Sequence, residues 1–290
     1  MYKAMNYWIF GGFDGQKTPC EFIDWAKSQK LDGVELTVGD AVKADISEAE
    51  CKKISDYAKQ KKIGLRTIAT GFYWGNSLGS EDEEERDRAV AFTRQYLRIA
   101  SWLGVETVLV VPGSSRVAWD PSRPVVSYKT VWVKSLKSLR ELAKLAEELK
   151  VNIGLENVWG RFLFSPIEWE KYLDEIKSDR IGMYLDVANC CPYVRPQDYV
   201  EVLGKKIMAV HMKNWSSDNL AGGNLLGFGE DITVGDVDFP AVLAALDKIG
   251  YKGTFTAEMI PFCRLPDLRI PDMDLAAATA ARLISLCHKS

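Results

Sequence analysis

The hexapeptide IGMYLD, residues 181–186, is a short apolar run that ends in a single carboxylate. The same pattern occurs upstream as VNIGLE at 151–156 and downstream as KIMAVH at 206–211 and GTFTAE at 253–258. Near-continuous apolar runs of this length are typical of parallel strands that are buried on both faces. We therefore expect four successive parallel strands, each with one polar side chain at its carboxyl end.

The pattern extends through the whole chain as eight strand-like runs that alternate with amphipathic helical segments. The predicted strands span residues 4–10, 33–37, 63–69, 107–111, 151–156, 181–186, 207–212 and 253–258. Their starts are about 36 residues apart on average, which suits one strand–helix unit each. The predicted helices include 18–30, 81–103 and 138–150. Eight such units predict an α/β fold of the (β/α)8 type, a TIM barrel with parallel strands, formed by residues 1–290 as a single domain.

An open, doubly wound sheet is the competing architecture. The motifs that favour it are missing, because no G-x-G-x-x-G follows the first predicted strand and no Walker A motif occurs. The longest irregular stretches are 71–80, 112–123 and 214–236. All three follow a predicted strand, where a barrel carries the loops that form its active site.

Composition and charge exclude several classes of protein. The chain has 290 residues, 47% of them hydrophobic, and a net charge of -3 from 37 basic and 40 acidic side chains. That balance argues against a protein that captures a nucleic-acid backbone, which needs a clustered basic surface. No apolar run reaches the length of a membrane span, and the start of the chain lacks a signal-peptide pattern. The six cysteines form no C-x-x-C pair and are interpreted as buried thiols, so we expect a cytoplasmic protein.

Four residues at the ends of the last four strands form the candidate functional site. They are Glu156, Asp186, His211 and Glu258. Each alone could cap a helix or pair with a basic neighbour, but together they converge at the mouth of a parallel barrel. Buried carboxylates are costly unless they are paired or bound to a cation. The sequence therefore predicts one divalent metal ion.

The ligand types indicate which metal and which chemistry to expect. Three carboxylates and one imidazole favour Mn²⁺, with Mg²⁺, Co²⁺ or Zn²⁺ as alternatives. Such an ion can chelate two vicinal oxygens of a sugar-like substrate and acidify the adjacent C–H bond. Glu156 and Glu258, three strands apart, are the expected proton acceptor and donor.

The motifs around these residues resemble those of the sugar phosphate isomerase/epimerase family of xylose isomerase-like barrels. They are GVEL, GLEN, YLDVAN, VHMKN and TAEM, in that order. The resemblance covers nearly the whole chain and is nearest to ketose 3-epimerases and to L-xylulose- or L-ribulose-5-phosphate 3-epimerases. It implies that Glu156, Asp186, His211 and Glu258 bind one Mn²⁺ or a similar ion. It also implies that the two glutamates move the C3 proton through a cis-enediolate, and that the chain forms a homodimer or homotetramer.

The sequence departs from the pattern of that family at two places. Free-ketose epimerases usually carry a substrate-contacting histidine where this chain has Asn189. They also carry a second glutamate shortly after the strand-five ligand, where this chain reads NVWGRF, with Trp159, Arg161 and Phe162. We expect recognition of the first three sugar oxygens to differ, while the metal chemistry is retained.

Further substrate-binding candidates lie just beyond the ligand positions. The set predicted to bind substrate is Trp74, Arg161, Asn189, Lys213 and Glu35. All but Asn189 have a plainer interpretation. Trp74 belongs to the aromatic stretch GFYWGN and could pack within its loop, Lys213 could be solvated, and Glu35 could pair across the barrel. Arg161, Arg195 and Arg264 are possible phosphate partners because guanidinium groups match phosphate geometry, although surface ion pairs are the commoner role.

Three other functions are weighed against a sugar or sugar-phosphate epimerase or isomerase. An inosose dehydratase-like lyase would use the same metal site and base. An apurinic endonuclease of this superfold needs several histidines, and the chain has two. The third is a non-catalytic sugar-binding or regulatory barrel, which measured turnover, or its absence, would distinguish from an enzyme. For the epimerase or isomerase, the expected partner is a small-molecule sugar or sugar phosphate, with neither nucleic acid nor membrane.

Overall fold

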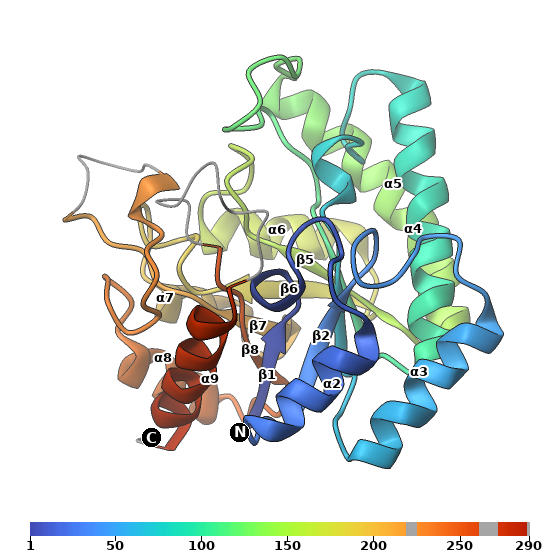
Figure 1. The fold of residues 1–290 in the computed structure, drawn as a ribbon. Helices are drawn as coiled ribbons and strands as arrows, with labels where there is room; N and C mark the ends of the chain where they lie inside the picture. Colours follow the sequence, from blue (N-terminus) through green and yellow to red (C-terminus); the bar gives the residue numbers. More distant parts are fainter. Residues whose placement is uncertain (219–224, 261–271, 289–290) are drawn as a thin grey trace.

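Eight parallel strands close into a barrel in chain order, from β1 beside β2 round to β8 beside β1. The computed structural model describes residues 1–218, 225–260 and 272–288. The sequence-based prediction of a (β/α)8 TIM barrel is confirmed (Figure 1). The strands are β1 Tyr2–Asn6, β2 Gly33–Thr37, β3 Thr67–Ala69, β4 Thr107–Val110, β5 Asn152–Glu156, β6 Ile181–Asp186, β7 Ile207–Met212 and β8 Thr254–Ala257.

Helices surround the barrel. The α-helices are α1 Trp8–Gly11, α2 Pro19–Ser28, α3 Glu48–Lys61, α4 Glu83–Leu103, α5 Tyr128–Leu149, α6 Pro166–Ile176, α7 Pro196–Leu203, α8 Phe239–Lys248 and α9 Met273–His288. From α2 to α8 each helix packs against the next one, and α9 packs against α1. Short 3-10 turns occur at Phe72–Trp74, Gly204–Lys206 and Leu225–Gly227. Within the described residues, no helix is long and apolar enough to cross a membrane.

Local sequence signals explain where the helices begin. Thr18, Ser47 and Ser165 each accept a hydrogen bond from the backbone N–H three residues later, and the glutamate carboxylate there accepts the backbone N–H of the cap residue. Such capping boxes satisfy backbone N–H groups that have no partner inside the helix. Pro19 and Pro166 occupy the first helical turn, where a missing N–H costs nothing.

The first predicted strand, 4–10, is wrong at its carboxyl end. The strand stops at Asn6, and Trp8–Gly11 form one buried helical turn. The Asn6 side chain causes the turn, because its oxygen accepts the N–H of Trp8 while its nitrogen donates to Glu35. Periodicity could not separate these alternatives, since a buried helical turn and a buried strand are both continuously apolar.

Two other boundaries differ from the prediction by more than two residues. Helix α5 begins ten residues before the predicted start at 138, because Ser127 caps it by accepting the N–H of Thr130. Strand β3 begins at Thr67, so 63–66 precede it, apart from one bridge between Gly33 and Gly64. Neither difference changes the order of the elements.

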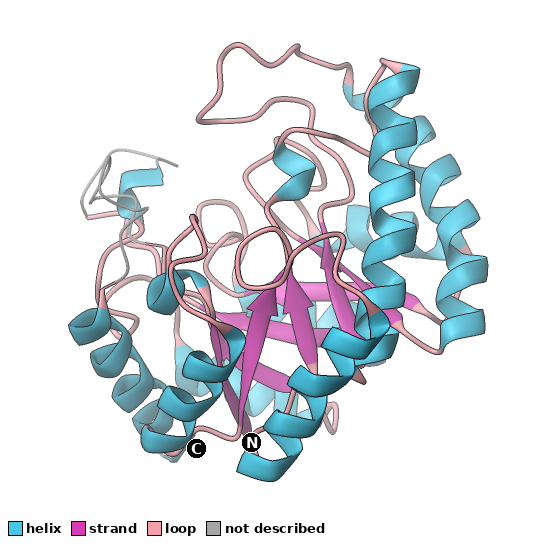
Figure 2. Cartoon of the chain, turned by 45° about the vertical axis from the view of Figure 1, so that its right-hand side comes forward, coloured by secondary structure: helices cyan, strands magenta, loops and turns pink. Residues whose placement is uncertain are grey.

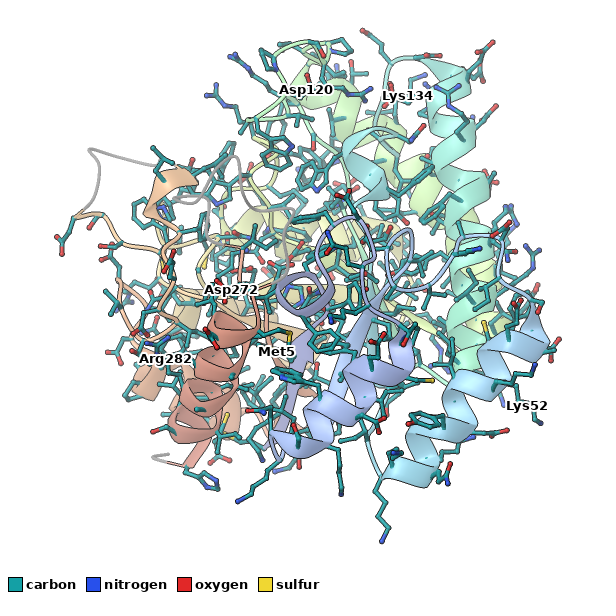
Figure 3. The ribbon with its side chains drawn as sticks, viewed as in Figure 1. Met5, Lys52, Asp120, Lys134, Asp272 and Arg282 are labelled. Carbon is teal, nitrogen blue, oxygen red and sulfur yellow. The ribbon has the colours of Figure 1, made fainter. Side chains whose placement is uncertain are left out.

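The interior and exterior of the barrel differ in polarity. Outward-facing side chains such as Val34 and Leu36 join the main hydrophobic core, whereas charged residues such as Lys52 lie on the outside of the helices (Figure 3). Inside the barrel, Glu35, Tyr184 and His211 are completely buried. Gly154 leaves room for Tyr184, since a Cβ there would lie 3.1 Å from that ring. The barrel is therefore filled by polar groups at its carboxyl end.

Long loops gather at the carboxyl ends of the strands (Figure 2). They include the three irregular stretches expected from the sequence, within the parts of the chain that are described. Of the cysteines, Cys51 and Cys190 are buried as predicted, whereas Cys20, Cys191 and Cys287 are partly exposed. Cys20, Cys51, Cys190 and Cys191 are free thiols, and Cys263 lies outside the described residues.

Candidate metal centre

Four side chains from adjacent strand ends meet at the carboxyl end of the barrel. Glu156 ends β5, Asp186 ends β6, His211 lies in β7 and Glu258 follows β8. Each offers one ligand atom, and these atoms all lie within 4.8 Å of one another. All four residues are buried. This group, called here the acid–histidine cluster, is the set that the sequence placed together.

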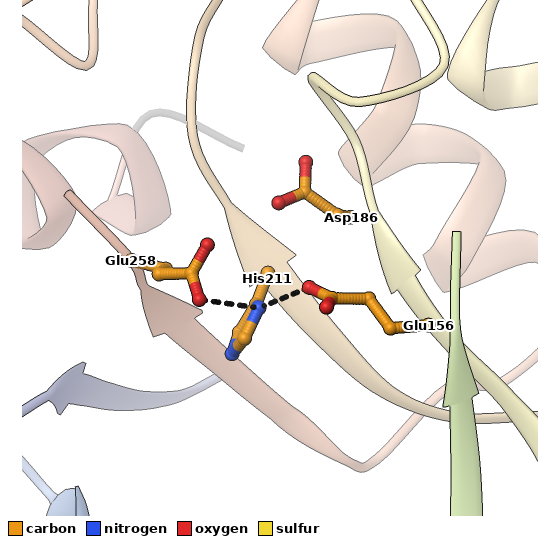
Figure 4. A group of neighbouring side chains, drawn as sticks. All are labelled: Glu156, Asp186, His211 and Glu258. Atoms are coloured by element: carbon orange, nitrogen blue, oxygen red, sulfur yellow. Dashed lines mark hydrogen bonds and ion pairs between the residues drawn. The ribbon is translucent and has the colours of Figure 1, made fainter. Parts of the chain in front are cut away.

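His211 is the centre of the cluster. Its Nδ1 lies 2.9 Å from Glu156 Oε1 and 3.6 Å from Glu258 Oε1. The two glutamates approach it from opposite sides (Figure 4). Its Nε2 lies 2.8 Å from Glu35 Oε1, on the opposite side of the ring from Glu156. Nδ1 is therefore the ring nitrogen that faces the other members of the cluster.

Glu35 contacts the His211 imidazole on the side that faces away from the other cluster residues. Its carboxylate accepts hydrogen bonds from Asn6 Nδ2 and from the Tyr184 hydroxyl, in addition to the contact with His211. Burial would raise the pKa of Glu35, but the charge of His211 and the hydrogen bonds from His211 and Tyr184 lower it below its usual value. Burial would lower the pKa of His211, but the charges of Glu35 and Glu258 raise it well above its usual value. The imidazole is thus fixed in orientation.

Asp186 is held by the end of the neighbouring strand. Asn157 Oδ1 accepts the N–H of Asp186, and Asn157 Nδ2 donates to the Asp186 carbonyl oxygen, both at 2.8 Å. One carboxylate oxygen of Asp186 accepts the N–H groups of Ala188 and Asn189. The other oxygen accepts the ammonium of Lys213 at 3.1 Å. The two strand ends are therefore locked together at the cluster.

Lys213 lies inside the ring of carboxylates. Its Nζ lies 2.6 Å from Glu258 Oε2, and the residue is buried, with 5% of its surface exposed. Burial would lower the pKa of Lys213, but Asp186 and Glu258 raise it above its usual value. Lys213 is therefore not solvated, which was the plainer interpretation of this residue in the sequence.

The cluster carries an excess of negative charge that a divalent cation would balance. Four buried carboxylates, including Glu35, face two cationic side chains, His211 and Lys213. Burial and the negative charge of the nearby Glu258 raise the pKa of Glu156 to about 7, because both disfavour its ionised form. Hard oxygen donors with one imidazole suit Mn²⁺ or Mg²⁺. The donor set and its buried, electron-rich setting therefore fit one divalent ion.

A cavity of about 320 Å³ opens directly above the cluster. Glu156, Glu258 and Lys213 form part of its floor, and Trp74 and Asn189 form part of its wall. The other lining residues are mostly apolar, and several are aromatic. They are Trp8, Phe13, Thr70, Gly71, Leu109, Val111, Trp119, Val158, Trp159, Leu225, Phe228 and Ile260.

The structure separates the predicted substrate-binding residues. Trp74, Asn189 and Lys213 line the 320 Å³ cavity. Arg161 is exposed and lines a neighbouring cavity of about 230 Å³. Glu35 makes its hydrogen bonds beneath His211, inside the barrel.

Two arginines and the aromatic stretch after β3 have other positions. Arg195 pairs with Asp198 on helix α7, and Arg264 lies outside the described residues. In the stretch GFYWGN, Phe72 stacks on Phe92 and Tyr73 is buried, so both pack within the protein. Of the three aromatic residues in this stretch, Trp74 alone lines the cavity. Packing within the protein therefore describes the first two, and a position at the candidate site describes the third.

Several residues of the site were not found from the sequence. Trp8 and Phe13 stack with ring centroids 5.4 Å apart and line the cavity. Trp8 lies in the run predicted as a strand, so it carried no separate signal. Asn157 belongs to the motif GLEN but was assigned no role, although its position next to Glu156 could have indicated one.

The fold and the site together define the class to which the protein belongs. The model of the xylose isomerase-like TIM barrel family matches residues 23–285, and the chain belongs to that family. Its relatives and structural neighbours include sugar epimerases.

Three similar proteins illustrate the range of that family. The putative L-ribulose-5-phosphate 3-epimerase SgbU of Escherichia coli (strain K12) is 24% identical over 241 residues, 81% of each chain. The inosose dehydratase of Geobacillus thermodenitrificans is 23% identical over 218 residues, 69% of this chain and 72% of that one. The structure of D-psicose 3-epimerase with D-tagatose from Clostridium cellulolyticum H10 superposes with a TM-score of 0.79 at 18% identity. It covers 100% of this chain and 99% of that one. The structural likeness supports the shared fold.

Proposed function

We propose that this protein is a divalent-metal-dependent epimerase or isomerase that acts on a ketose or ketose phosphate. The reaction is exchange of the C3 proton through an enediolate. Glu156 and Glu258 are the catalytic residues, and with Asp186 and His211 they hold the metal, Mn²⁺ being favoured. The relatives named as 3-epimerases support the reaction class.

The position of the two glutamates is the observation that carries this proposal. They reach His211 Nδ1 from opposite sides and both line the floor of the cavity. Inversion at one carbon needs a proton to leave from one face and return to the other, which two separate carboxylates can do. The pKa of Glu156, raised to about 7, suits a group that both accepts and donates a proton near neutral pH.

A bound divalent ion would supply Lewis-acid polarisation of vicinal substrate oxygens. Side chains of the protein supply the orientation of the ligands and a further positive charge. Glu35 orients His211, and Asn157 orients Asp186. Lys213 places a positive charge 2.6 Å from Glu258, where it can donate to a substrate oxygen that becomes negative.

Dehydration, as in an inosose dehydratase-like lyase, is the second candidate. The relative of that name supports it, and so does the ammonium of Lys213 beside Glu258, since elimination needs an acid to protonate the departing hydroxide. Both reactions begin with the same proton abstraction. They differ in the next step, which is return of a proton to C3 in the epimerase and loss of hydroxide in the lyase.

One experiment separates the two reactions. Protein loaded with Mn²⁺ is incubated in D₂O with a panel of ketoses, ketose phosphates and inososes, and products are followed by NMR. An epimerase places deuterium at C3 of the epimer without loss of oxygen, whereas a lyase gives a product that has lost water.

The matched controls are Glu156→Gln and, on the exposed face of α5, Glu148→Gln. We expect exchange to collapse in the first variant and to persist in the second. Absence of any exchange or binding across the panel, by protein shown to contain metal, would overturn the proposed function in favour of a non-catalytic barrel.

Other features stay predictions from the sequence. They are the organisation of residues 1–290 as one domain, a homodimer or homotetramer, a cytoplasmic location, and Arg161, Trp74, Asn189, Lys213 and Glu35 as substrate-binding residues.

A further inference from the structure

A second cavity of about 230 Å³ adjoins the one above the acid–histidine cluster. The two cavities share four lining residues, Val158, Trp159, Asn189 and Leu225. The second one, called here the side cavity, extends between the loop after β5 and the loop after β6. A ligand held at the cluster could therefore continue into the side cavity without leaving the protein.

Exposed aromatic rings are concentrated at these cavities. Trp119, Phe164 and Tyr193 are the aromatic residues among the exposed large hydrophobic side chains of the described chain. Trp119 lines the main cavity, and the other two line the side cavity. Tyr193 is 55% exposed and meets Phe164 edge to face, with centroids 5.3 Å apart. Exposed aromatic surface in a concave site marks a place where a ligand is bound.

The backbone of the loop after β5 is strained where it forms the side cavity. Six residues other than glycine have positive φ among the described residues, and four of them are lysines at helix ends. The remaining two are Arg161 at 52° and Leu163 at 59°, both lining the side cavity. A left-handed conformation is unfavourable for leucine, because its Cβ lies too close to the following carbonyl oxygen. Strain of this kind clusters at ligand-binding sites, where the surrounding structure maintains it.

Polar groups at the junction of the two cavities lack protein partners. The indole N–H of Trp159 is buried and makes no hydrogen bond within the described residues. Asn189 Nδ2 donates to the carbonyl of Asn157, while no hydrogen bond to its Oδ1 occurs in the described part of the chain. An unpaired donor and an unpaired acceptor together match a hydroxyl group, which both accepts and donates.

The lining of the side cavity favours a neutral ring over a phosphate. Arg161 is the one basic residue among the described lining residues, and it is exposed. The backbone N–H groups of Leu163 and Phe164 already donate to Tyr128 and Glu168, so they are not available to an anion. Aromatic rings with a few hydrogen-bonding groups suit the face of a sugar ring, which presents C–H bonds edged by hydroxyl groups.

We infer that the side cavity is a glycosyl subsite, so that the substrate is a ketose carrying a second sugar ring. This inference rests on the proposed function, because it takes the reacting ketose to lie at the acid–histidine cluster. It adds that Tyr193 and Phe164 hold the second ring and that Trp159 and Asn189 bind hydroxyl groups near the linkage.

Equilibrium binding tests the inference without depending on turnover. Protein loaded with Mn²⁺ is titrated calorimetrically with D-fructose, with D-fructose 6-phosphate, and with isomaltulose and lactulose, two ketose disaccharides with a free C3 hydroxyl. We expect at least one disaccharide to bind ten times or more tightly than D-fructose. That ratio should fall at least fivefold in Tyr193→Ala and Phe164→Ala. It should be unchanged in Ile167→Ala, a control at an exposed residue of α6 that lines neither cavity.

Three results would overturn the inference. The disaccharides could bind no more tightly than D-fructose, or their advantage could survive in both aromatic variants. The tightest ligand could instead be the phosphate, with a preference that is lost in Arg161→Gln, which would make the side cavity an anion site. In all three cases D-fructose still binds, so the proposed function is not overturned by the result. Failure of every sugar to bind would remove the proposed function and this inference together.

Discussion

Strands β5–β8 and strands β1–β4 build two halves of the same cavity from different kinds of residue. The ends of β5–β8 carry Glu156, Asp186, His211 and Glu258. The ends of β1–β4 and their loops contribute Trp8, Phe13, Trp74, Leu109, Val111 and Trp119. A sugar bound between them would turn its oxygen atoms to the charged half and its C–H bonds to the aromatic half. The charged residues that line the cavity thus come from one arc of the barrel, whereas its aromatic lining comes from both, since Trp159 and Phe228 follow β5 and β7.

The largest effect is expected from the charged half. Glu156→Gln and Glu258→Gln keep the shape and one oxygen ligand but remove the basic group, so turnover should fall by about 10²–10³-fold or more. Metal content, measured by elemental analysis, should largely remain. One variant is expected to exchange the C3 proton from a single face without forming the epimer, which would show the face that each glutamate serves. Near-normal epimerisation in both variants would exclude the two-base assignment.

Metal binding should distinguish the ligand from the residue that supports it. His211→Ala removes a ligand and should abolish measurable Mn²⁺ binding at micromolar metal. Glu35→Gln should weaken binding by about 10–100-fold, because a carboxylate behind a ligating histidine fixes its tautomer and orientation. Both are measured by metal titration, with Glu148→Gln as the control. Full Mn²⁺ affinity in Glu35→Gln would show that hydrogen bonding behind the ring is dispensable.

Mn²⁺ affinity should also depend on pH. The pKa of His211 is raised well above its usual value, so binding through Nδ1 displaces a proton at neutral pH. Below about pH 7 the Glu156 carboxyl is protonated too, and a second proton must leave. Affinity should therefore increase with pH, and more steeply below about pH 7 than above it. Titrations between about pH 5.5 and 8.5 in two buffers report the protons released, and a flat profile would contradict this account.

The smallest effect is expected in the aromatic half. Trp74→Ala should raise KM by about threefold to tenfold with little change in kcat, since the ring is expected to bind the sugar face and not the reacting atoms. Trp74→Phe, which retains a ring, should recover most of the loss. A fall in kcat instead would place Trp74 closer to the chemistry than the cavity geometry suggests.

The same division explains how much could be predicted from the sequence. The charged half was predictable because its residues end regular apolar strands, where position along the chain fixes position in the barrel. The aromatic half lies mostly on loops. Trp8 was hidden in an apolar run, and Trp119 lies in the long loop after β4. Loop conformation depends on contacts such as that of Asn6 with Trp8, which no periodic pattern encodes.

Lys213 and Glu35 show a different limit. The sequence placed both at the site, but it could not show which partner each one meets. Lys213 contacts Asp186 and Glu258, and Glu35 contacts the far nitrogen of His211. These pairings join residues of different strands, so they depend on the closure of the barrel and on the register between strands.

The two hydrogen bonds from Asn157 to the backbone of Asp186 have a practical consequence for engineering. They tie the exits of β5 and β6 together before either loop begins, so the loops beyond can change without moving the ligands. A mutant library that varies 158–164 and 190–195 while keeping Asn157 should yield many folded, metal-binding variants with altered substrate range. The same library built on Asn157→Ala should yield few.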